Sequence, residues 1–191
     1  MKSENQQLNQ IRDRLRMLLN THLSTVSHQT LTAAMGEVLI QQDSPAERVL
    51  LVQTGELKVE RCEEGGTPQV IAHIGPNELV GEMALIGDEH HSATVTVSSG
   101  PAEILVVQAD DLLQAAIYDS DLVMELLALS SNRCRQTNSH LTLILEALQA
   151  LDRAHDSTLE RCCSELERCS DPALSSAAQR LRRLKQAANT P

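Results

Sequence analysis

The sequence is poor in aromatic residues, since its 191 residues include no Phe, no Trp and a single Tyr, Tyr118. A hydrophobic core must therefore be built from Leu, Val, Ile and Ala. No run approaches the roughly 18–20 apolar residues of a membrane-spanning helix, and the polar N-terminus lacks the apolar segment of a signal peptide. The five cysteines follow no metal-ligand spacing, which fits reduced thiols. We therefore expect a cytoplasmic protein that makes no membrane contact.

Positive charge is missing from the middle of the chain, because the 71 residues between Arg61 and Arg133 include no Lys or Arg. The formal net charge is −10, and residues 1–120 account for it with 17 acidic and 7 basic residues. Proteins bind nucleic acid and anionic lipid through Lys and Arg side chains that displace counterions. This distribution leads us to expect that neither DNA nor a membrane is a partner.

Residues 35–107 consist of short apolar or alternating runs separated by turn residues. The runs are EVLI, RVLLV, ELKVE, QVIAHI, SATVTV and EILVV, and the turns include SPAE, EEGGTP, GPNE and SSGP. Short strands with Gly and Pro between them are typical of an all-β barrel or sandwich. Residues 5–20 are amphipathic and predict a leading helix, whereas residues 21–32 show no clear pattern and are assigned as a connector.

Glycine and proline are absent from residues 102–171, which favours helices throughout that stretch. A short helix is expected first, followed by a long one in which apolar or small residues recur at steps of three and four: Val123, Leu127, Ser130, Cys134, Thr137, Leu141, Ile144, Leu148, Leu151, His155, Leu159, Cys162, Leu166 and Cys169. This narrow repeat predicts a coiled coil over residues 121–169 that forms a homodimer. The repeat is strained near His155, where the helix either continues or folds back as a hairpin.

The C-terminal region carries two further features. A last helix is expected over residues 173–187 with the basic run RLRRLK, which either contacts an acidic partner or docks on the acidic barrel. Cys162, Cys163 and Cys169 either pack as small apolar residues or respond to redox state. We divide the chain into a barrel with its leading helix, residues 1–120, and a helical region, residues 121–191.

Residues 81–95 have the sequence GEMALIGDEHHSATV, a tight glycine turn with a carboxylate, a short apolar run, an acidic tip and a strand. Together with GEVLIQQDSPAERVLLVQTGELKVE, residues 36–60, this stretch resembles the cyclic nucleotide-binding domain family over roughly residues 10–140. The resemblance implies a leading helix, an eight-stranded barrel of the jelly-roll type, a short helix and a long helix that often dimerises. It also implies cyclic AMP or cyclic GMP as ligand, with no other cofactor required.

The resemblance also assigns roles to particular residues of this phosphate-binding segment, which we call the cassette. Glu82 matches the carboxylate that accepts a hydrogen bond from the ribose. The turn and its short helix correspond to Gly81, Met83, Ala84 and Leu85, and the small residues that follow the phosphate-binding arginine correspond to Ser92 and Ala93. On the long helix, Arg133 and Thr137 match a pair that faces the nucleotide.

The arginine that pairs with the phosphate in this family is replaced by His91. One interpretation is that a protonated His91 holds the phosphate, with binding that depends on pH because the imidazole pKa is about 6.5. The other is that His91 is an exposed polar residue of a site that no longer binds. His90 and His91 beside Asp88 and Glu89 could form a metal site, although adjacent residues of this kind more often face solvent.

No pattern of catalytic residues is evident, so we expect a protein that is not an enzyme. The favoured interpretation is a regulatory protein that senses a small ligand in the barrel and signals through a helical dimer to a protein partner near residues 140–191. The alternative is a ligand-free dimeric scaffold. A DNA-reading helix-turn-helix is not expected, because only about 20 residues follow Pro172.

Overall fold

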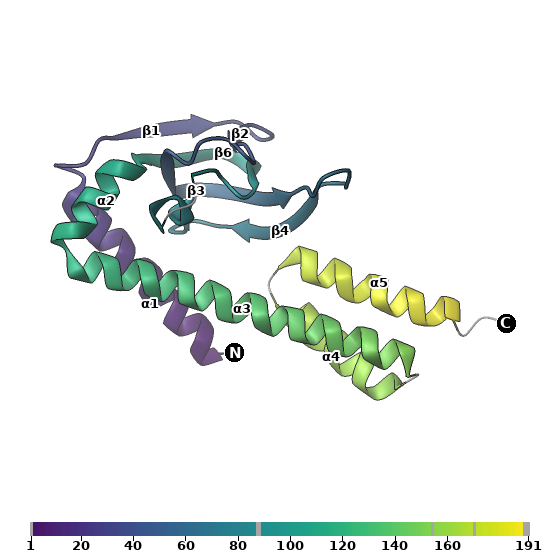
Figure 1. Cartoon of the computed structure of the whole chain (residues 1–191). Helices are drawn as coiled ribbons and strands as arrows, with labels where there is room; N and C mark the ends of the chain where they lie inside the picture. The colour runs from purple at the N-terminus through teal and green to yellow at the C-terminus, as the bar shows by residue number, and fades with distance from the viewer. Residues whose placement is uncertain (1, 87–88, 154, 170, 189–191) are drawn as a thin grey trace. The chain divides into compact units, whose positions relative to one another are not determined.

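The computed structural model describes residues 2–86, 89–153, 155–169 and 171–188. The chain divides into two compact units, Met1–Ser130 and Ser131–Pro191, and each is described by itself. This division falls ten residues after the domain boundary expected from the sequence. The expected domain boundary stays a prediction. Figure 1 labels the α-helices of both units and all strands except β5.

Six strands form one antiparallel sheet in the first unit, in the order β1-β6-β3-β4, with β2 also paired to β6 and β5 also paired to β3. The strands are β1 (His28–Ala33), β2 (Val38–Ile40), β3 (Arg48–Arg61), β4 (Gln69–Ile74), β5 (Leu79–Val80) and β6 (Thr94–Gln108). All six contribute side chains to one core cluster, so the sheet wraps around an apolar interior. The predicted fold class, mainly a β barrel with flanking helices, is confirmed.

The number of strands differs from the expected eight because two predicted turns lie inside long strands. RVLLV and ELKVE are the two halves of β3, and SATVTV and EILVV are the two halves of β6. The register between β3 and β6 shifts around Gly55, whose φ is +85° and where a Cβ would lie 2.7 Å from the Ala102 Cβ. Gly55 therefore lets the two strands cross closely instead of ending one of them.

Alternate residues of β3 pack into the interior of the barrel and against the layer of helices outside it. Leu50 and Val52 belong to the core inside the sheet, whereas Val49 and Leu51 belong to a second core that faces the helices. Because successive side chains of a strand point to opposite faces, covering both faces requires a continuous apolar run. This explains why RVLLV does not alternate between apolar and polar residues.

Three helices cover the outer face of this sheet: α1 (Lys2–His22), α2 (Ala109–Tyr118) and the beginning of α3 (Ser120–Asp152). The leading helix is confirmed, and its Leu15 and Leu19 share a core with Leu112, Leu122 and Leu129. Burying each such leucine stabilises the fold by about 1.5–3 kcal/mol. The predicted connector is partly wrong, because β1 lies within it and pairs along its whole length with β6.

The second unit is a bundle of three helices formed by the remainder of α3, α4 (Asp156–Arg168) and α5 (Pro172–Ala188). Its core holds residues from all three: Ala147, Ala150, Leu159, Cys162, Cys163, Leu166, Ala178 and Leu181. A single helical seam over residues 121–169 was therefore a wrong prediction. The chain leaves α3 after Asp152 and reverses, because Leu159, Cys162 and Leu166 bury their side chains against helices of their own chain.

Ion pairs between α4 and α5 involve two of the four basic residues in the run RLRRLK of α5. Arg182 pairs with Glu160 at 2.7 Å and also with Glu167, while Lys185 pairs with Asp156 at 3.1 Å. Hydrogen bonds to Glu160 and Glu167 raise the pKa of Arg182 above its ordinary value. These two basic side chains are thus engaged within the second unit.

The cysteines of α4 are buried in this bundle. Cys162 and Cys163 are fully buried, and burial is the main cause that raises the pKa of both thiols. A raised thiol pKa lowers the fraction of reactive thiolate. This supports the interpretation that they pack as small apolar residues.

Candidate functional site

The cassette begins where β5 ends and the 3-10 helix η1 (Glu82–Ile86) starts. Gly81, between them, has a φ of +86°, and a Cβ there would lie 2.8 Å from the carbonyl oxygen of Arg48. Both the left-handed backbone and the close approach to β3 require glycine at this position. The predicted glycine turn is therefore present, and it holds the cassette tightly against the start of β3.

The motif residues after this turn differ in exposure. Glu82 is buried at 5% exposure, a rare state for a carboxylate. Met83 is exposed, whereas Leu85 is partly buried and packs against the core on the helix side of the sheet. The side chain of Ala84 lies outside the described residues. Glu82 is thus the one acidic side chain of η1, and it is enclosed by protein.

His91 is buried at 8% exposure, which contradicts the interpretation of an exposed polar residue. Its backbone N–H donates to Ser44 (2.9 Å), and its carbonyl accepts from the N–H of Asp43 (2.8 Å). Its ring atom Cε1 lies 3.5 Å from the position that a Gly81 Cβ would take. His91 therefore returns the chain to the turn where the cassette begins.

The electrostatics of His91 oppose the idea of a protonated phosphate ligand. Burial lowers the pKa of His91 below 6.5, and the positive charge of Arg48 lowers it further. The imidazole is therefore neutral at neutral pH. In that form it accepts one hydrogen bond and donates another, but it supplies no fixed charge.

Ser92 and Ala93 follow His91 at the entrance to β6. Ser92 is exposed, and Ala93 is buried at 8% exposure. His90 is also exposed, and its backbone bridges to Pro45. Among the described residues, no group of three His, Cys, Asp or Glu side chains could hold a metal ion, and Asp88 of the proposed metal set lies outside them.

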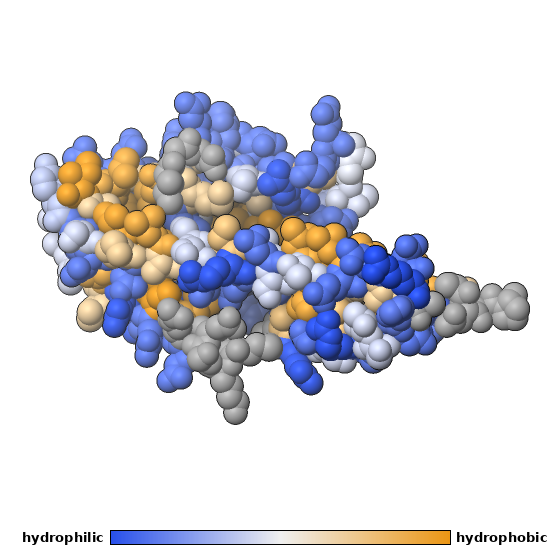
Figure 2. Space-filling model, turned by 60° about the horizontal axis from the view of Figure 1, so that its bottom comes forward, coloured by the Kyte–Doolittle hydropathy of each residue, from blue (hydrophilic) through white to orange (hydrophobic). Residues whose placement is uncertain are grey.

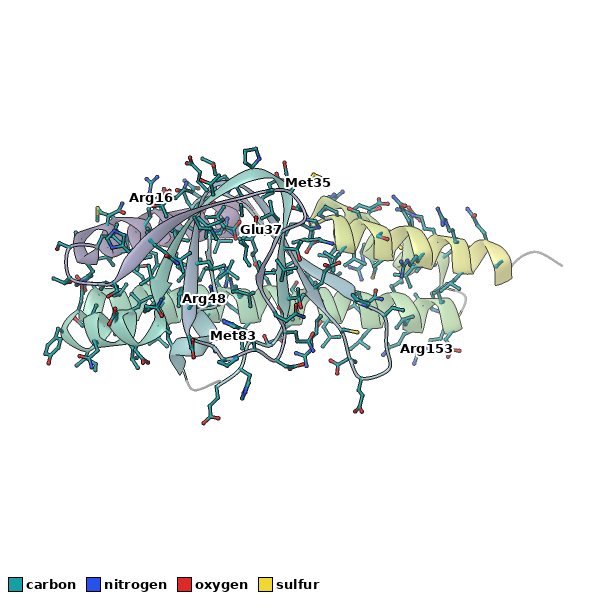
Figure 3. All side chains as sticks on the ribbon, turned by 90° about the horizontal axis from the view of Figure 1, so that it is seen from above. Arg16, Met35, Glu37, Arg48, Met83 and Arg153 are labelled. Carbon is teal, nitrogen blue, oxygen red and sulfur yellow. The ribbon has the colours of Figure 1, made fainter. Side chains whose placement is uncertain are left out.

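Arg48 was missed from the sequence, although it is the cation of the first unit whose charge acts on His91. It is the first residue of β3 and is exposed. Leu50 pairs with Val80 and Leu51 with Leu79, so extending that register by two residues sets Arg48 at the level of Glu82. Figure 3 labels Arg48 close to Met83 of η1. The signal available in the sequence was the run RVLLV, which places Arg48 on the face of Leu50 and Val52.

Arg133 and Thr137 belong to the second unit. They lie one turn apart on α3, where the Thr137 hydroxyl donates to the carbonyl of Arg133 at 3.0 Å. The first unit therefore brings together Gly81, Glu82 and His91. The contribution of Arg133 and Thr137 to the same site stays a prediction.

Comparison with known proteins assigns the barrel to a family. The profile of the cyclic nucleotide-binding domain matches residues 30–118. The "Cyclic AMP receptor protein" of Thermus thermophilus is 32% identical over 110 residues, which cover 57% of this chain and 50% of that protein. The "CRP-like cAMP-activated global transcriptional regulator" of Mycobacterium tuberculosis is 25% identical, covering 56% of this chain and 47% of that protein. This chain thus spans about half the length of these curated relatives.

Among solved structures, the catabolite activator protein of Thermus thermophilus superimposes with a TM-score of 0.59 at 22% identity. The match covers 90% of this chain and 82% of that one and supports the fold. The same domain also occurs in enzymes, since an acetyltransferase and a cGMP-dependent protein kinase match over 20% and 10% of their lengths.

The expectation that excluded DNA as a partner was wrong, because a transcriptional regulator is among the relatives. The acidic charge of residues 1–120 belongs to the part of the chain that contains the barrel. It gives no information on the half of these relatives that this chain does not match. Among the described residues, no helix is long and apolar enough to cross a membrane. With the barrel, the glycine turn, the buried carboxylate and the matching profile in place, residues 30–118 form a domain of the cyclic nucleotide-binding family.

Proposed function

We propose that this chain is a non-catalytic signal receiver whose barrel binds a small anionic ligand, a cyclic nucleotide as in the name of its Thermus relative. One observation carries the proposal: Gly81, the buried Glu82 and the buried His91 of the cassette lie together beside the start of β3, a strand distant from them in the sequence. A carboxylate and an imidazole can accept and donate the hydrogen bonds that a polar ligand needs. Their gathering at one glycine turn supports a binding role.

The chemistry of these residues suits a nucleotide. A carboxylate such as Glu82 accepts hydrogen bonds from sugar hydroxyls, and a neutral His91 can both donate and accept. The core inside the sheet is purely aliphatic, which offers apolar contact but no aromatic ring on which a base could stack.

We further propose that α3 carries the response through a homodimer. On the part of α3 in the second unit, Leu141, Leu145 and Leu148 are 52%, 49% and 47% exposed. In the first unit, Met124 and Leu127 are 63% and 50% exposed on the same helix. Leu127, Leu141 and Leu148 differ by multiples of seven, as the seam of a coiled coil requires.

This face, which we call the α3 stripe, differs from the longer seam predicted from the sequence because it ends with α3. Figure 2 shows, on one face of the molecule, hydrophobic residues in orange that reach the surface among hydrophilic residues in blue. A second copy of the chain would cover the stripe by symmetry, and ligand binding in the barrel would shift the dimer between two states. The output is a protein partner or, since DNA is no longer excluded, a DNA site.

The test is calorimetric titration of the purified chain with cyclic AMP and cyclic GMP, with adenosine monophosphate as the acyclic control. We expect saturable binding of a cyclic nucleotide that Glu82→Gln weakens at least about tenfold, since a hydrogen bond to a charged group contributes about 1.5–3 kcal/mol. Glu37→Gln is the matched control, because Glu37 bonds the backbone of Ala34 in another turn. No heat with any nucleotide at millimolar concentration would favour the ligand-free scaffold instead.

A further inference from the structure

We propose that Arg48 is the residue through which the barrel holds the ligand's anionic group, in place of the cation that the cassette lacks. The proposal deepens the proposed function, on which its choice of a nucleotide as ligand rests. It assigns a binding role to the first residue of β3, 34 positions before Glu82 in the sequence. It also predicts that the fixed charge comes from the sheet instead of the cassette.

The first argument is geometric. The carbonyl oxygen of Arg48 lies 2.8 Å from the position of a Cβ on Gly81, so the backbones of the two residues are in contact. The extended register with β5 sets Arg48 at the level of Glu82. Alternation along β3 places the Arg48 side chain on the inner face of the sheet with Leu50 and Val52. An anion seated at the glycine turn would therefore lie within reach of the long Arg48 side chain.

The second argument concerns the other basic residues of the first unit. Five of them are engaged at short range by acceptors elsewhere: Arg12 with Glu78 (2.7 Å), Arg14 with Glu125 (3.1 Å), Arg16 with Asn77 (3.2 Å), Lys58 with Glu60 (2.9 Å) and Arg61 with Glu63 (2.9 Å). Arg48 forms no ion pair with any residue in the described part of the chain. Its charge therefore remains available to an incoming anion.

The third argument is chemical. A guanidinium presents parallel N–H donors that match two oxygens of a phosphate. Because the lowered pKa of His91 favours its neutral form, it does not compete for the anion as a second cation, and the carboxylate of Glu82 suits the hydroxyl side of the ligand. Burial is the main cause of the lowered pKa of His91, and the positive charge of Arg48 lowers it further. Arg48, Glu82 and His91 would thus divide the recognition of phosphate and sugar between them.

The test compares Arg48→Gln and Arg48→Lys with Arg61→Gln, a matched control because Arg61 is an exposed arginine at the other end of the same strand. Two probes are titrated by calorimetry: cyclic AMP and inorganic phosphate. The titration of the His91 ring is followed by NMR in the same proteins. A two-dimensional amide spectrum verifies that each variant is folded.

We expect Arg48→Gln to weaken binding of both probes about ten- to a hundredfold, as loss of a charge-assisted hydrogen bond does. Arg48→Lys should weaken it less, and Arg61→Gln by less than about twofold. The pKa of His91 should rise in Arg48→Gln and stay constant in Arg61→Gln.

The remaining outcomes distinguish the proposed role of Arg48 from the proposed function. If cyclic AMP binds and Arg48→Gln binds it equally well, the role of Arg48 is refuted while the proposed function stands. If no cyclic nucleotide binds but phosphate binds in a way that depends on Arg48, the anion site stands and the proposed function fails. The role of Arg48 is also refuted if neither probe binds the unmodified chain, or if the pKa of His91 is the same in Arg48→Gln as in the unmodified chain.

Discussion

Replacing Gly81 by Ala tests the close approach that builds the site. The φ of +86° at Gly81 costs an alanine roughly 1–2 kcal/mol, and reduced freedom of the unfolded chain returns about 0.4–1 kcal/mol. The new Cβ would also stand 2.8 Å from the Arg48 carbonyl oxygen, which is too close for any side-chain carbon. Because that neighbour is backbone, the strand must move, and overpacking of this kind costs about 1–3 kcal/mol.

A matched control separates the two costs. Gly36 has nearly the same φ, +85°, but a Cβ there would meet nothing within 4 Å. Gly36→Ala should therefore carry the backbone cost alone, while Gly81→Ala carries both. The difference between the two variants should be about 1–3 kcal/mol in the free energy of unfolding.

The measurement is hydrogen exchange of peptides from β3 and β6, which reports the opening of the barrel without the signal of the second unit. Thermal unfolding gives a second estimate, in which 1 kcal/mol corresponds to about 2–4 °C for a chain of this size. Equal destabilisation by Gly81→Ala and Gly36→Ala would refute the tight contact between the cassette and β3. It would also remove the geometric basis for placing Arg48 at the site.

Three further predictions concern pH, the α3 stripe and the second unit. Because folding lowers the pKa of His91, the unfolded chain takes up a proton at this residue at a higher pH than the folded chain does, so the free energy of unfolding falls as the pH drops from about 6.5 towards the folded pKa. In urea unfolding, His91→Gln should therefore show a flatter dependence of the free energy of unfolding on pH between about pH 5 and 7. An unchanged pH dependence in this variant would contradict the burial of the ring. The double variant Leu141→Glu, Leu148→Glu should be a monomer in light scattering. Leu184→Glu, which changes an exposed leucine of α5, should remain a dimer. If the double variant also remains a dimer, the dimer does not form through the α3 stripe. Leu166→Ala should lower the free energy of unfolding of the second unit by about 2–5 kcal/mol because the side chain is fully buried, and normal exchange in α4 and α5 peptides would show that this core is assigned wrongly.

The elements that sequence reasoning found are those with a local signal. The helix α1 was found because Leu8, Ile11, Leu15 and Leu19 recur at helical spacing. The strands of the barrel were found because apolar runs stand between turn residues, and the cassette because Gly81 and Glu82 occur within a longer motif. In each case neighbouring residues carry the information.

The elements that were missed depend on contacts between distant residues. β1 has the sequence HQTLTA, in which most side chains are exposed, so its pairing with β6 leaves little apolar alternation. The chain reversal after α3 was one of two alternatives that the strained repeat near His155 left open, because the reversal contains no Gly or Pro. The core that Leu159 and Leu166 share with residues of α3 and α5 decides between them.

The site, like the fold, could be predicted only where its residues are neighbours in the sequence. Glu82 and Gly81 lie within one motif, and the structure places them at one turn as expected. Arg48 was overlooked because its link to the cassette is the pairing of β3 with β5, which joins residues about 30 positions apart. His91 was misjudged because it is fixed by backbone hydrogen bonds to Asp43 and Ser44, a pairing between distant residues that no local pattern reveals.

The most direct test of the account is the affinity of the purified chain for cyclic AMP, measured by calorimetry beside Glu82→Gln and Arg48→Gln. We expect saturable binding by the unmodified chain and a loss of about tenfold or more in each variant. Absence of binding by the unmodified chain at millimolar cyclic AMP and cyclic GMP would contradict it. Binding that neither substitution weakens would show that the ligand occupies another part of the molecule.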